Sequence, residues 1–242
     1  MRPFPLIKVL SAALCALLVP LVGLYFCGFW MPNRPSPVQY PIRGVDVSRH
    51  QGLIDWNAVA ESGVRFVYLK ATEGGDFQDE NFTVNLSGAR QAGLLCGAYH
   101  FFSFKSPGLT QARNFINTVP RDACALPPAI DLEYTGNSTA RPTAADFHEQ
   151  FDAFLKALRA EYGREPLIYA DDELSRDYLD GYAFPRRWVR AVLSRPGPGW
   201  MFWQFSERGK VPGIHGYVDM DVFDGSAADF NALAMDHSLI SP

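Results

Sequence analysis

The sequence lacks the short motifs that bind metals and nucleotides. It contains no Cys-x-x-Cys, no His-Glu-x-x-His, no Gly-x-Gly-x-x-Gly and no Walker-type loop. Its four cysteines and five scattered histidines leave little material for a transition-metal centre. We therefore expect a protein that works with no metal and no cofactor.

Basic charge is also scarce. The chain has 22 basic and 26 acidic residues, and four of the basic ones precede Gly44 in a stretch without acids. The remainder therefore has a net charge of −8, whereas a protein that follows nucleic-acid phosphates carries a clustered basic face. Nucleic acid is thus excluded as a partner, and the 48% hydrophobic and 20% charged content is typical of a folded chain.

One long segment has no charge at all. Val9 through Trp30 is 22 residues long, enough for a helix to span the ~30 Å hydrocarbon core of a bilayer. Arg2 and Lys8 precede it and would hold the N-terminus in the cytoplasm. Its end lacks the small-x-small pattern of a cleavage site, so residues 1–30 are predicted to be a signal anchor, with a cleaved signal peptide as the alternative.

The anchor would place the rest of the chain outside the cytoplasm, in the periplasm or the extracellular space. In the alternative, the chain would be secreted after cleavage of the signal peptide. Residues 31–43 are rich in proline and predict an extended linker, of which residues 31–40 would span roughly 30 Å in a polyproline-like conformation. Residues 44–242 form one predicted domain, which we expect to be a monomer.

Short apolar runs alternate with helical patterns from Gly44 onward. Strands are predicted at 44–48, 66–71, 96–102, 128–133, 167–170, 188–192, 201–205 and 217–219, and helices near 55–62, 81–92, 110–119 and 143–162. Near-continuous apolar strands are typical of a parallel sheet covered on its outer face, and eight of them favour a closed barrel. The prediction is an α/β fold: an irregular TIM-like β/α barrel of eight strands, with reduced helices in the last third and a transmembrane helix before it.

Acidic residues stand at the strand ends, where barrels of this kind assemble their catalytic groups. Asp46 lies in the first predicted strand, Asp131 and Glu133 end the fourth, and Asp219 ends the last. Asp131 and Glu133 are two residues apart, so their side chains leave the same face about 6.6 Å apart. Crowded carboxyl groups raise one pKa, and glycosidases need both a carboxylic acid and a carboxylate. Each acid alone could equally cap a loop or begin a turn, but the set favours a carboxylate-based hydrolase.

Three aromatic residues near strand ends are candidates for sugar contacts. Tyr99, Tyr169 and Trp203 could form walls of a substrate site, because sugar rings pack their C–H faces on aromatic side chains. Core packing is the competing use of each.

Other polar residues receive structural interpretations. Lys70 and Glu73 are expected to form an ion pair, and His100, within an apolar strand, to be a hydrogen-bonded core residue. Cys96 and Cys124 lie near the beginnings of two neighbouring predicted strands, at the same rim of the barrel. The sequence is compatible with a disulfide between them and with two buried free thiols.

Several blocks of sequence occur in a specific order. They are 44–48 (Gly-Val-Asp-Val-Ser), 51–56 (Gln-Gly-Leu-Ile-Asp-Trp), 66–74 (Phe-Val-Tyr-Leu-Lys-Ala-Thr-Glu-Gly), 97–101 (Gly-Ala-Tyr-His-Phe), 126–133 (Leu-Pro-Pro-Ala-Ile-Asp-Leu-Glu), 166–169 (Pro-Leu-Ile-Tyr), 203–206 (Trp-Gln-Phe-Ser) and 211–219 (Val-Pro-Gly-Ile-His-Gly-Tyr-Val-Asp). The ordered set resembles glycoside hydrolase family 25, the lysozymes or N-acetylmuramidases, over essentially residues 44–224.

The resemblance implies an irregular barrel and cleavage, without a cofactor, of the β-1,4 bond between N-acetylmuramic acid and N-acetylglucosamine in peptidoglycan. By motif, Glu133 would be the general acid/base, with Asp131, Asp46 and Asp219 as supporting carboxylates. The family is retaining, and its nucleophile is either a carboxylate or the substrate's own acetamido oxygen. One departure is Arg190, in a strand where the family usually has alanine followed by an aromatic residue.

A membrane-tethered protein that binds peptidoglycan without cutting it is the alternative function. It would have the same fold. A protein that only binds has no need for several carboxylates that repel one another, so the four acids argue against it. An amidase would need zinc or an activated cysteine, and the sequence has no motif for either.

The predicted anchor leads to a test of location. If Val9–Trp30 is not cleaved, the full-length protein stays in the membrane fraction after salt and carbonate washing, with Arg2 and Lys8 retained. Fractionation followed by N-terminal sequencing measures this. A soluble extracytoplasmic form that begins between Phe26 and Ser36 would instead establish a signal peptide.

Overall fold

The computed structural model describes residues 4–28, 30–182 and 184–235, so Arg2 of the predicted anchor and residues 236–242 of the predicted barrel lie outside the described residues. The strands are β1 (Arg43–Val47), β2 (Phe66–Glu73), β3 (Phe77–Gln78), β4 (Leu95–Phe101), β5 (Ala129–Leu132), β6 (Leu167–Ala170), β7 (Arg187–Arg190), β8 (Phe202–Gly209) and β9 (Val218–Phe223). The helices are α1 (Phe4–Phe26), the 3₁₀ turn Arg49–Gln51, α2 (Trp56–Glu61), α3 (Phe82–Gln91), α4 (Gly108–Thr118), α5 (Ala144–Tyr162), α6 (Asp172–Tyr178) and α7 (Ala227–Met235).

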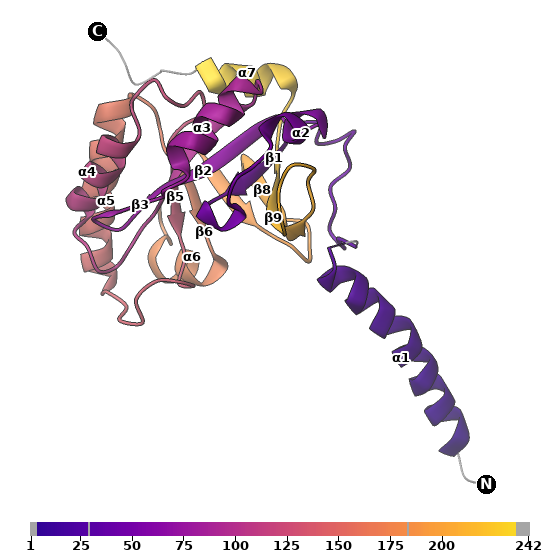
Figure 1. The fold of residues 1–242 in the computed structure, drawn as a ribbon. Helices are drawn as coiled ribbons and strands as arrows, with labels where there is room; N and C mark the ends of the chain where they lie inside the picture. The colour runs from indigo at the N-terminus through magenta and orange to yellow at the C-terminus, as the bar shows by residue number, and fades with distance from the viewer. Residues whose placement is uncertain (1–3, 29, 183, 236–242) are drawn as a thin grey trace.

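The strands form one sheet that closes on itself (Figure 1). Its order is β1-β9-β8-β7-β6-β5-β4-β2-β3, and β1 also pairs with β2. Because β3 only extends the end of β2 as a short antiparallel pair, eight strands make the barrel. The predicted closed, irregular barrel of eight strands is confirmed.

The expectation of a parallel sheet is wrong for the last strand. β9 runs antiparallel to both of its neighbours, β8 and β1. The reason is the short connection from β8, since a hairpin joins antiparallel strands and a parallel pair needs a longer crossover. Asp219 therefore lies near the beginning of β9 rather than its end. That beginning is at the same mouth of the barrel as the carboxyl ends of the parallel strands.

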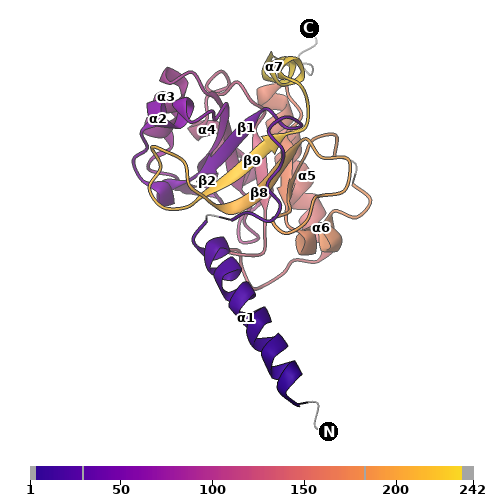
Figure 2. The same cartoon turned by 90° about the vertical axis from the view of Figure 1, so that its right-hand side faces the viewer.

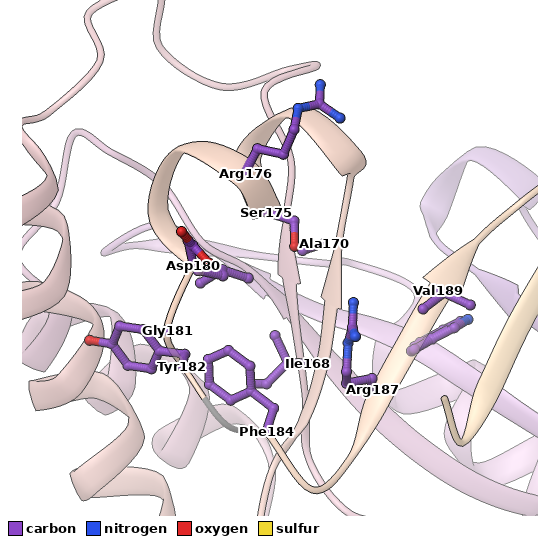
Figure 3. Close-up of a pocket in the computed structure, with 12 residues that line it drawn as sticks. Ile168, Ala170, Ser175, Arg176, Asp180, Gly181, Tyr182, Phe184, Arg187 and Val189 are labelled. Carbon is purple, nitrogen blue, oxygen red and sulfur yellow. The ribbon is translucent and has the colours of Figure 1, made fainter. Parts of the chain in front are cut away.

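Helices cover the barrel unevenly. The long helices α3, α4 and α5 pack outside the first five strands, whereas within residues 184–235 no helix joins β7 to β8 or β8 to β9 (Figures 1 and 2). α6, which was not predicted, has only seven residues. It leaves a pocket of about 560 Å³ on the outer side of β6 and β7, lined by Ile168, Ala170, Arg187 and Val189 among others (Figure 3). The predicted reduction of helices in the last third is confirmed.

Aromatic rings fill the barrel at the end where the parallel strands begin. Phe66, Phe202 and Phe223 meet inside it, with ring centroids 5.1 Å apart for Phe66 and Phe202 and 5.3 Å for Phe202 and Phe223. Phe230 and Leu233 of α7, a helix that was not predicted, pack against these rings and close this end. Among the residues that the structure describes, the opposite mouth is the end left open to a substrate.

The proline-rich segment before β1 is packed rather than extended. Tyr40 is buried, and its ring lies 5.6 Å from that of Trp200 and 5.9 Å from that of Trp203. The Asn33 side chain donates a hydrogen bond of 2.7 Å to the backbone oxygen of Ala191, after β7. The segment thus covers the outer face of β8, where a regular barrel would have a helix.

Cys96 and Cys124 are both free thiols. Burial raises the pKa of each to about 12, so neither thiol ionises near neutral pH. Of the two states left open by the sequence, the structure has the free thiols.

The packing of the segment before β1 can be tested by substitution. Tyr40→Ala should lower the free energy of unfolding by on the order of 3 kcal/mol, because it removes a buried ring from between two tryptophans. Urea unfolding of a soluble form that begins at Met31 measures the loss. Val38→Ala, at a residue 91% exposed in the same segment, is the matched control and should change stability by less than about 0.5 kcal/mol. Equal effects of the two substitutions would contradict the packing.

Candidate active site

A pocket of about 160 Å³ opens at the mouth of the barrel. Its described lining residues are Asp46, Tyr99, Ala129, Ile130, Asp131, Glu133, Tyr169, Trp188, Gln204 and Asp219. The structure therefore brings together all four carboxyl groups singled out in the sequence and two of the three aromatic residues. The larger pocket beside α6 contains none of the four carboxyl groups among its described lining residues.

Strand register positions the carboxyl groups. Asp46 lies directly opposite Asp219 in the antiparallel β1–β9 pair, where facing Cα atoms are about 4.5–5.5 Å apart. Asp131 is beside Tyr169 in the parallel β5–β6 pair. Glu133 follows the end of β5, two residues from Asp131, so both side chains reach the pocket.

Trp203 does not reach this pocket. Alternation along β8 points Phe202 and Gln204 into the barrel and Trp203 outward, where it packs under Tyr40. The Trp203 indole N–H donates a hydrogen bond of 2.9 Å to the backbone oxygen of Ala191. Of the two uses considered for Trp203, sugar contact and core packing, the structure has core packing.

Gln204, the next residue along β8, was missed by sequence reasoning. Its Nε2 donates a hydrogen bond of 3.1 Å to Oδ2 of Asp46, and its Oε1 accepts one of 3.1 Å from the Tyr169 hydroxyl. This buried amide holds Asp46 and Tyr169 in fixed orientations. Two sequence signals pointed to it: it is a polar residue within an apolar strand, and it belongs to the block at residues 203–206.

Asp221 was also missed, although it lies two residues beyond Asp219 on the same side of β9. Its side chain is fully buried, and Oδ1 accepts a hydrogen bond of 2.9 Å from the indole N–H of Trp188. Burial raises the pKa of Asp221, and the charge of Asp219 raises it further. Burial raises the pKa of Asp46 as well, with a further contribution from Asp221. The acids extend one layer deeper into the barrel than the sequence indicated.

The two acids of β5 differ in their surroundings. Burial and the neighbouring Glu133 hold the pKa of Asp131 well above its usual range, and Lys70 partly offsets this. Burial also raises the pKa of Glu133, while a hydrogen bond with the Tyr169 hydroxyl lowers it and Asp171 raises it. Because these groups disfavour simultaneous ionisation, the pocket retains a protonated carboxyl group at a pH where free carboxyls are ionised.

The structural interpretations of Lys70, Glu73 and His100 are confirmed. Lys70 Nζ lies 2.7 Å from Glu73 Oε2. His100 is fully buried and makes hydrogen bonds of 2.7 Å with the Thr72 hydroxyl and 3.0 Å with the Gln111 side chain. Burial lowers the pKa of His100 to about 4, so the ring stays neutral.

Arg190, the departure noted in the sequence, lies near the rim of the pocket. Its guanidinium forms an ion pair with Glu207 of β8, and both side chains are partly exposed. Its positive charge lowers the pKa of Glu133, opposing the effect of burial. The rim therefore carries a paired cation where an apolar residue was expected.

An eight-stranded barrel with paired carboxyl groups of raised pKa at its open mouth is an arrangement that glycoside hydrolases use. Comparison with known proteins agrees. The sequence profile of Glycosyl hydrolases family 25 matches residues 45–214. The chain belongs to this family and is a glycoside hydrolase of the lysozyme type.

Its relatives cover most of the chain. A family 25 glycosyl hydrolase structure from Bacillus anthracis has 36% sequence identity and a TM-score of 0.77, covering 84% of this chain and 97% of that one. Lysozyme M1 of Streptomyces globisporus is 34% identical over 216 residues, which are 80% of this chain and 71% of that protein. The Escherichia coli K12 protein YegX is 37% identical over 206 residues, 81% of this chain and 74% of its own.

The buried carboxyl of Asp221 predicts a pH-dependent stability. Because its pKa is raised in the folded state, its contribution is fully present below the ordinary value of about 3.9 and is lost as pH rises through the raised pKa. The melting temperature of Asp221→Asn should therefore exceed that of the wild type near pH 8, with the gap closing toward pH 4. Asp224→Asn, at an exposed residue of the same segment, is the control and should show no such trend. Parallel pH profiles for Asp221→Asn and the wild type would refute the interpretation.

Proposed function

We propose that this chain cleaves the β-1,4 bond between N-acetylmuramic acid and N-acetylglucosamine in peptidoglycan. The observation that carries the proposal is the pairing of Asp131 and Glu133 in one pocket, each with a raised pKa. Membership of a lysozyme family supports the choice of substrate.

Glu133 is the proposed general acid/base. In its protonated form it donates a proton to the glycosidic oxygen as the C–O bond breaks. The resulting carboxylate then removes a proton from the water that completes hydrolysis. The neighbouring Tyr169 hydroxyl moderates the pKa of this carboxyl group.

Asp131 is proposed to orient the nucleophile. Its Oδ1 is buried, and among the described residues no group donates a hydrogen bond to it. That oxygen can accept a hydrogen bond from the N–H of a substrate acetamido group. This hydrogen bond would direct the acetamido oxygen at the anomeric carbon. This favours the substrate's own acetamido group over a carboxylate nucleophile, because Asp46 is already engaged by Gln204.

Two tyrosines would contact the sugar. Burial raises the pKa of both Tyr99 and Tyr169 well above the usual value, so their hydroxyls remain protonated donors. Asp46 and Asp219 lie side by side on the paired strands β1 and β9, and in their ionised form either would support positive charge that develops on the ring.

The barrel is proposed to act outside the cytoplasm as a monomer, anchored by α1. Val9–Phe26 is long and apolar enough to cross a membrane by length and composition, and the side chains of Val9–Leu24 are exposed. Peptidoglycan would be the only polymer partner; the acidic body disfavours nucleic acid.

The products of digestion test the bond specificity. A soluble form beginning at Met31, incubated with purified peptidoglycan and a chelator, should release fragments with reducing N-acetylmuramic acid ends. Mass spectrometry of reduced muropeptides identifies the ends. Reducing N-acetylglucosamine ends, anhydro ends or freed peptides would each reject the proposed reaction, and binding without any release would favour the non-cutting alternative.

Substitution tests the roles of the two acids. Glu133→Gln should fold normally and lose at least about 10²–10⁴-fold in kcat, because general acid catalysis supplies that factor. Asp131→Asn should also be severely impaired. Glu149→Gln, at an exposed residue of α5, is the matched control and should keep wild-type turnover. Near-normal turnover by a folded Glu133→Gln protein would end the assignment.

A further inference from the structure

The N-terminal helix leaves the barrel from the same end as the active site. α7 closes the end where the parallel strands begin, and α6, which follows the carboxyl end of β6, marks the opposite mouth. Figures 1 and 2 both show α1 extending away from the molecule on the side opposite α7. The proposed anchor and the catalytic mouth therefore share one end of the barrel.

Side chains of the rim hold the last turn of α1. The backbone oxygen of Phe26 accepts hydrogen bonds of 2.9 Å from the Tyr217 hydroxyl and 3.2 Å from Arg208 Nη1. The Arg208 guanidinium lies 4.9 Å from the centre of the Phe26 ring and 5.5 Å from that of Tyr217. A cation and a hydroxyl at a helix C-terminus satisfy its free carbonyls and its dipole. Arg208 ends β8 and Tyr217 precedes β9, so both belong to the rim of the mouth.

The chain after α1 has little slack. Gly28 has φ +72°, and a Cβ there would lie 2.3 Å from the backbone oxygen of Arg208, so the chain passes directly against the rim. The following segment is then fixed to the side of the barrel through Asn33 and Tyr40. Because this segment packs on the barrel, it does not extend between the membrane and the barrel as the proline-rich sequence predicted.

Residues around this junction suit the surface of a bilayer. Aromatic side chains (Tyr25, Trp30, Tyr217) and basic side chains (Arg208, Lys210) surround the end of the apolar span Val9–Phe26. Trp and Tyr are enriched where a membrane helix meets water, and basic side chains pair there with lipid phosphates. We call these five residues the collar. The collar places the headgroup layer at the rim of the mouth.

We propose that the catalytic mouth faces the membrane. The substrate is then the glycan next to the bilayer, that is, strands with one end still attached to a membrane lipid, and not the peptidoglycan farther from the membrane. The inference rests on the proposed muramidase activity and on an uncleaved α1. A tether fixed at the rim keeps the pocket at the height of the headgroups. Glycan farther from the bilayer lies on the α7 side of the barrel, away from the open mouth.

The orientation can be measured without any catalysis. In a protein with Cys15→Ala and Cys27→Ala, a fluorophore is attached at Thr135→Cys on the loop after β5, or at Ala228→Cys on α7, both exposed residues. Cys96 is buried and Cys124 partly buried, and burial raises the pKa of both thiols; the same protein without the added cysteine measures any labelling of these two residues. In vesicles that contain a headgroup-attached quencher, quenching should be several-fold stronger at Thr135→Cys than at Ala228→Cys. Equal quenching, or stronger quenching at Ala228→Cys, would overturn the proposed orientation.

A change at the junction gives a second test of orientation. Adding Arg208→Ala and Tyr217→Phe should release the end of α1 and reduce the difference between the two labels. Arg113→Ala with Tyr182→Phe, which removes the same groups from exposed or partly exposed residues remote from the collar, is the matched control and should leave it unchanged. A difference that survives loss of the collar contacts would show that they do not set the orientation.

Activity on three substrates tests the choice of glycan. The full-length protein in phospholipid vesicles is given lipid-linked glycan strands in the same vesicles, free soluble strands of equal length, and isolated wall sacculi. We expect at least tenfold faster cleavage of the lipid-linked strands than of sacculi, with short stubs left on the lipid. Failure of the soluble form to cut free strands would reject the muramidase function itself, whereas cleavage of sacculi as fast as of lipid-linked strands would reject only the present inference.

A longer tether separates orientation from simple proximity. A flexible Gly/Ser insert of about 20 residues between Trp30 and Met31, combined with Arg208→Ala and Tyr217→Phe to release the rim contacts of Phe26, adds roughly 25 Å of reach while keeping the protein on the vesicle. The insert should lengthen the stubs and increase cleavage of sacculi. Stubs of unchanged length would mean that attachment to the membrane alone, and not the direction of the mouth, selects the substrate.

Discussion

The site depends on the cost of burying several carboxyl groups together. Five of them lie in the half of the barrel next to the open mouth: Asp46, Asp131, Glu133, Asp219 and Asp221. On the side toward α7 the interior is filled with aromatic rings that cannot solvate charge. Full ionisation would place like charges side by side in a poorly hydrated space, so some of the group must remain protonated. An acid able to donate a proton near neutral pH is a direct result of this crowding.

The geometry of closure decides which acids meet. If β9 ran parallel to β8, its beginning and Asp219 would lie at the aromatic end. The tight connection reverses the strand and brings Asp219 to the mouth, opposite Asp46. The same reversal carries Asp221 inward to the Trp188 indole. One hairpin therefore completes both the barrel wall and the set of carboxyl groups.

The acids could be predicted from the sequence because a carboxyl group in an apolar strand has few structural uses. The sequence could not predict which side chains of β8 point into the barrel. Trp203 and Phe205 are as apolar as Phe202, and strands buried on both sides show no period-two pattern. An error of one residue moves a side chain to the other face, which is why Trp203 was predicted and Gln204 was missed. The packing of Tyr40 depends on contacts more than 150 residues away in sequence, as its distance from Trp200 and Trp203 along the chain shows.

The profile match and the folded unit have different limits. The match covers residues 45–214 and ends before β9, the strand that joins β8 to β1. A fragment cut at those limits would leave two strands with unpaired backbone groups and would uncover Trp200 and Trp203. Open strand edges beside exposed aromatic side chains recruit other chains, so such a fragment would aggregate. The complete barrel therefore needs residues that lie outside the profile match, on both sides of it.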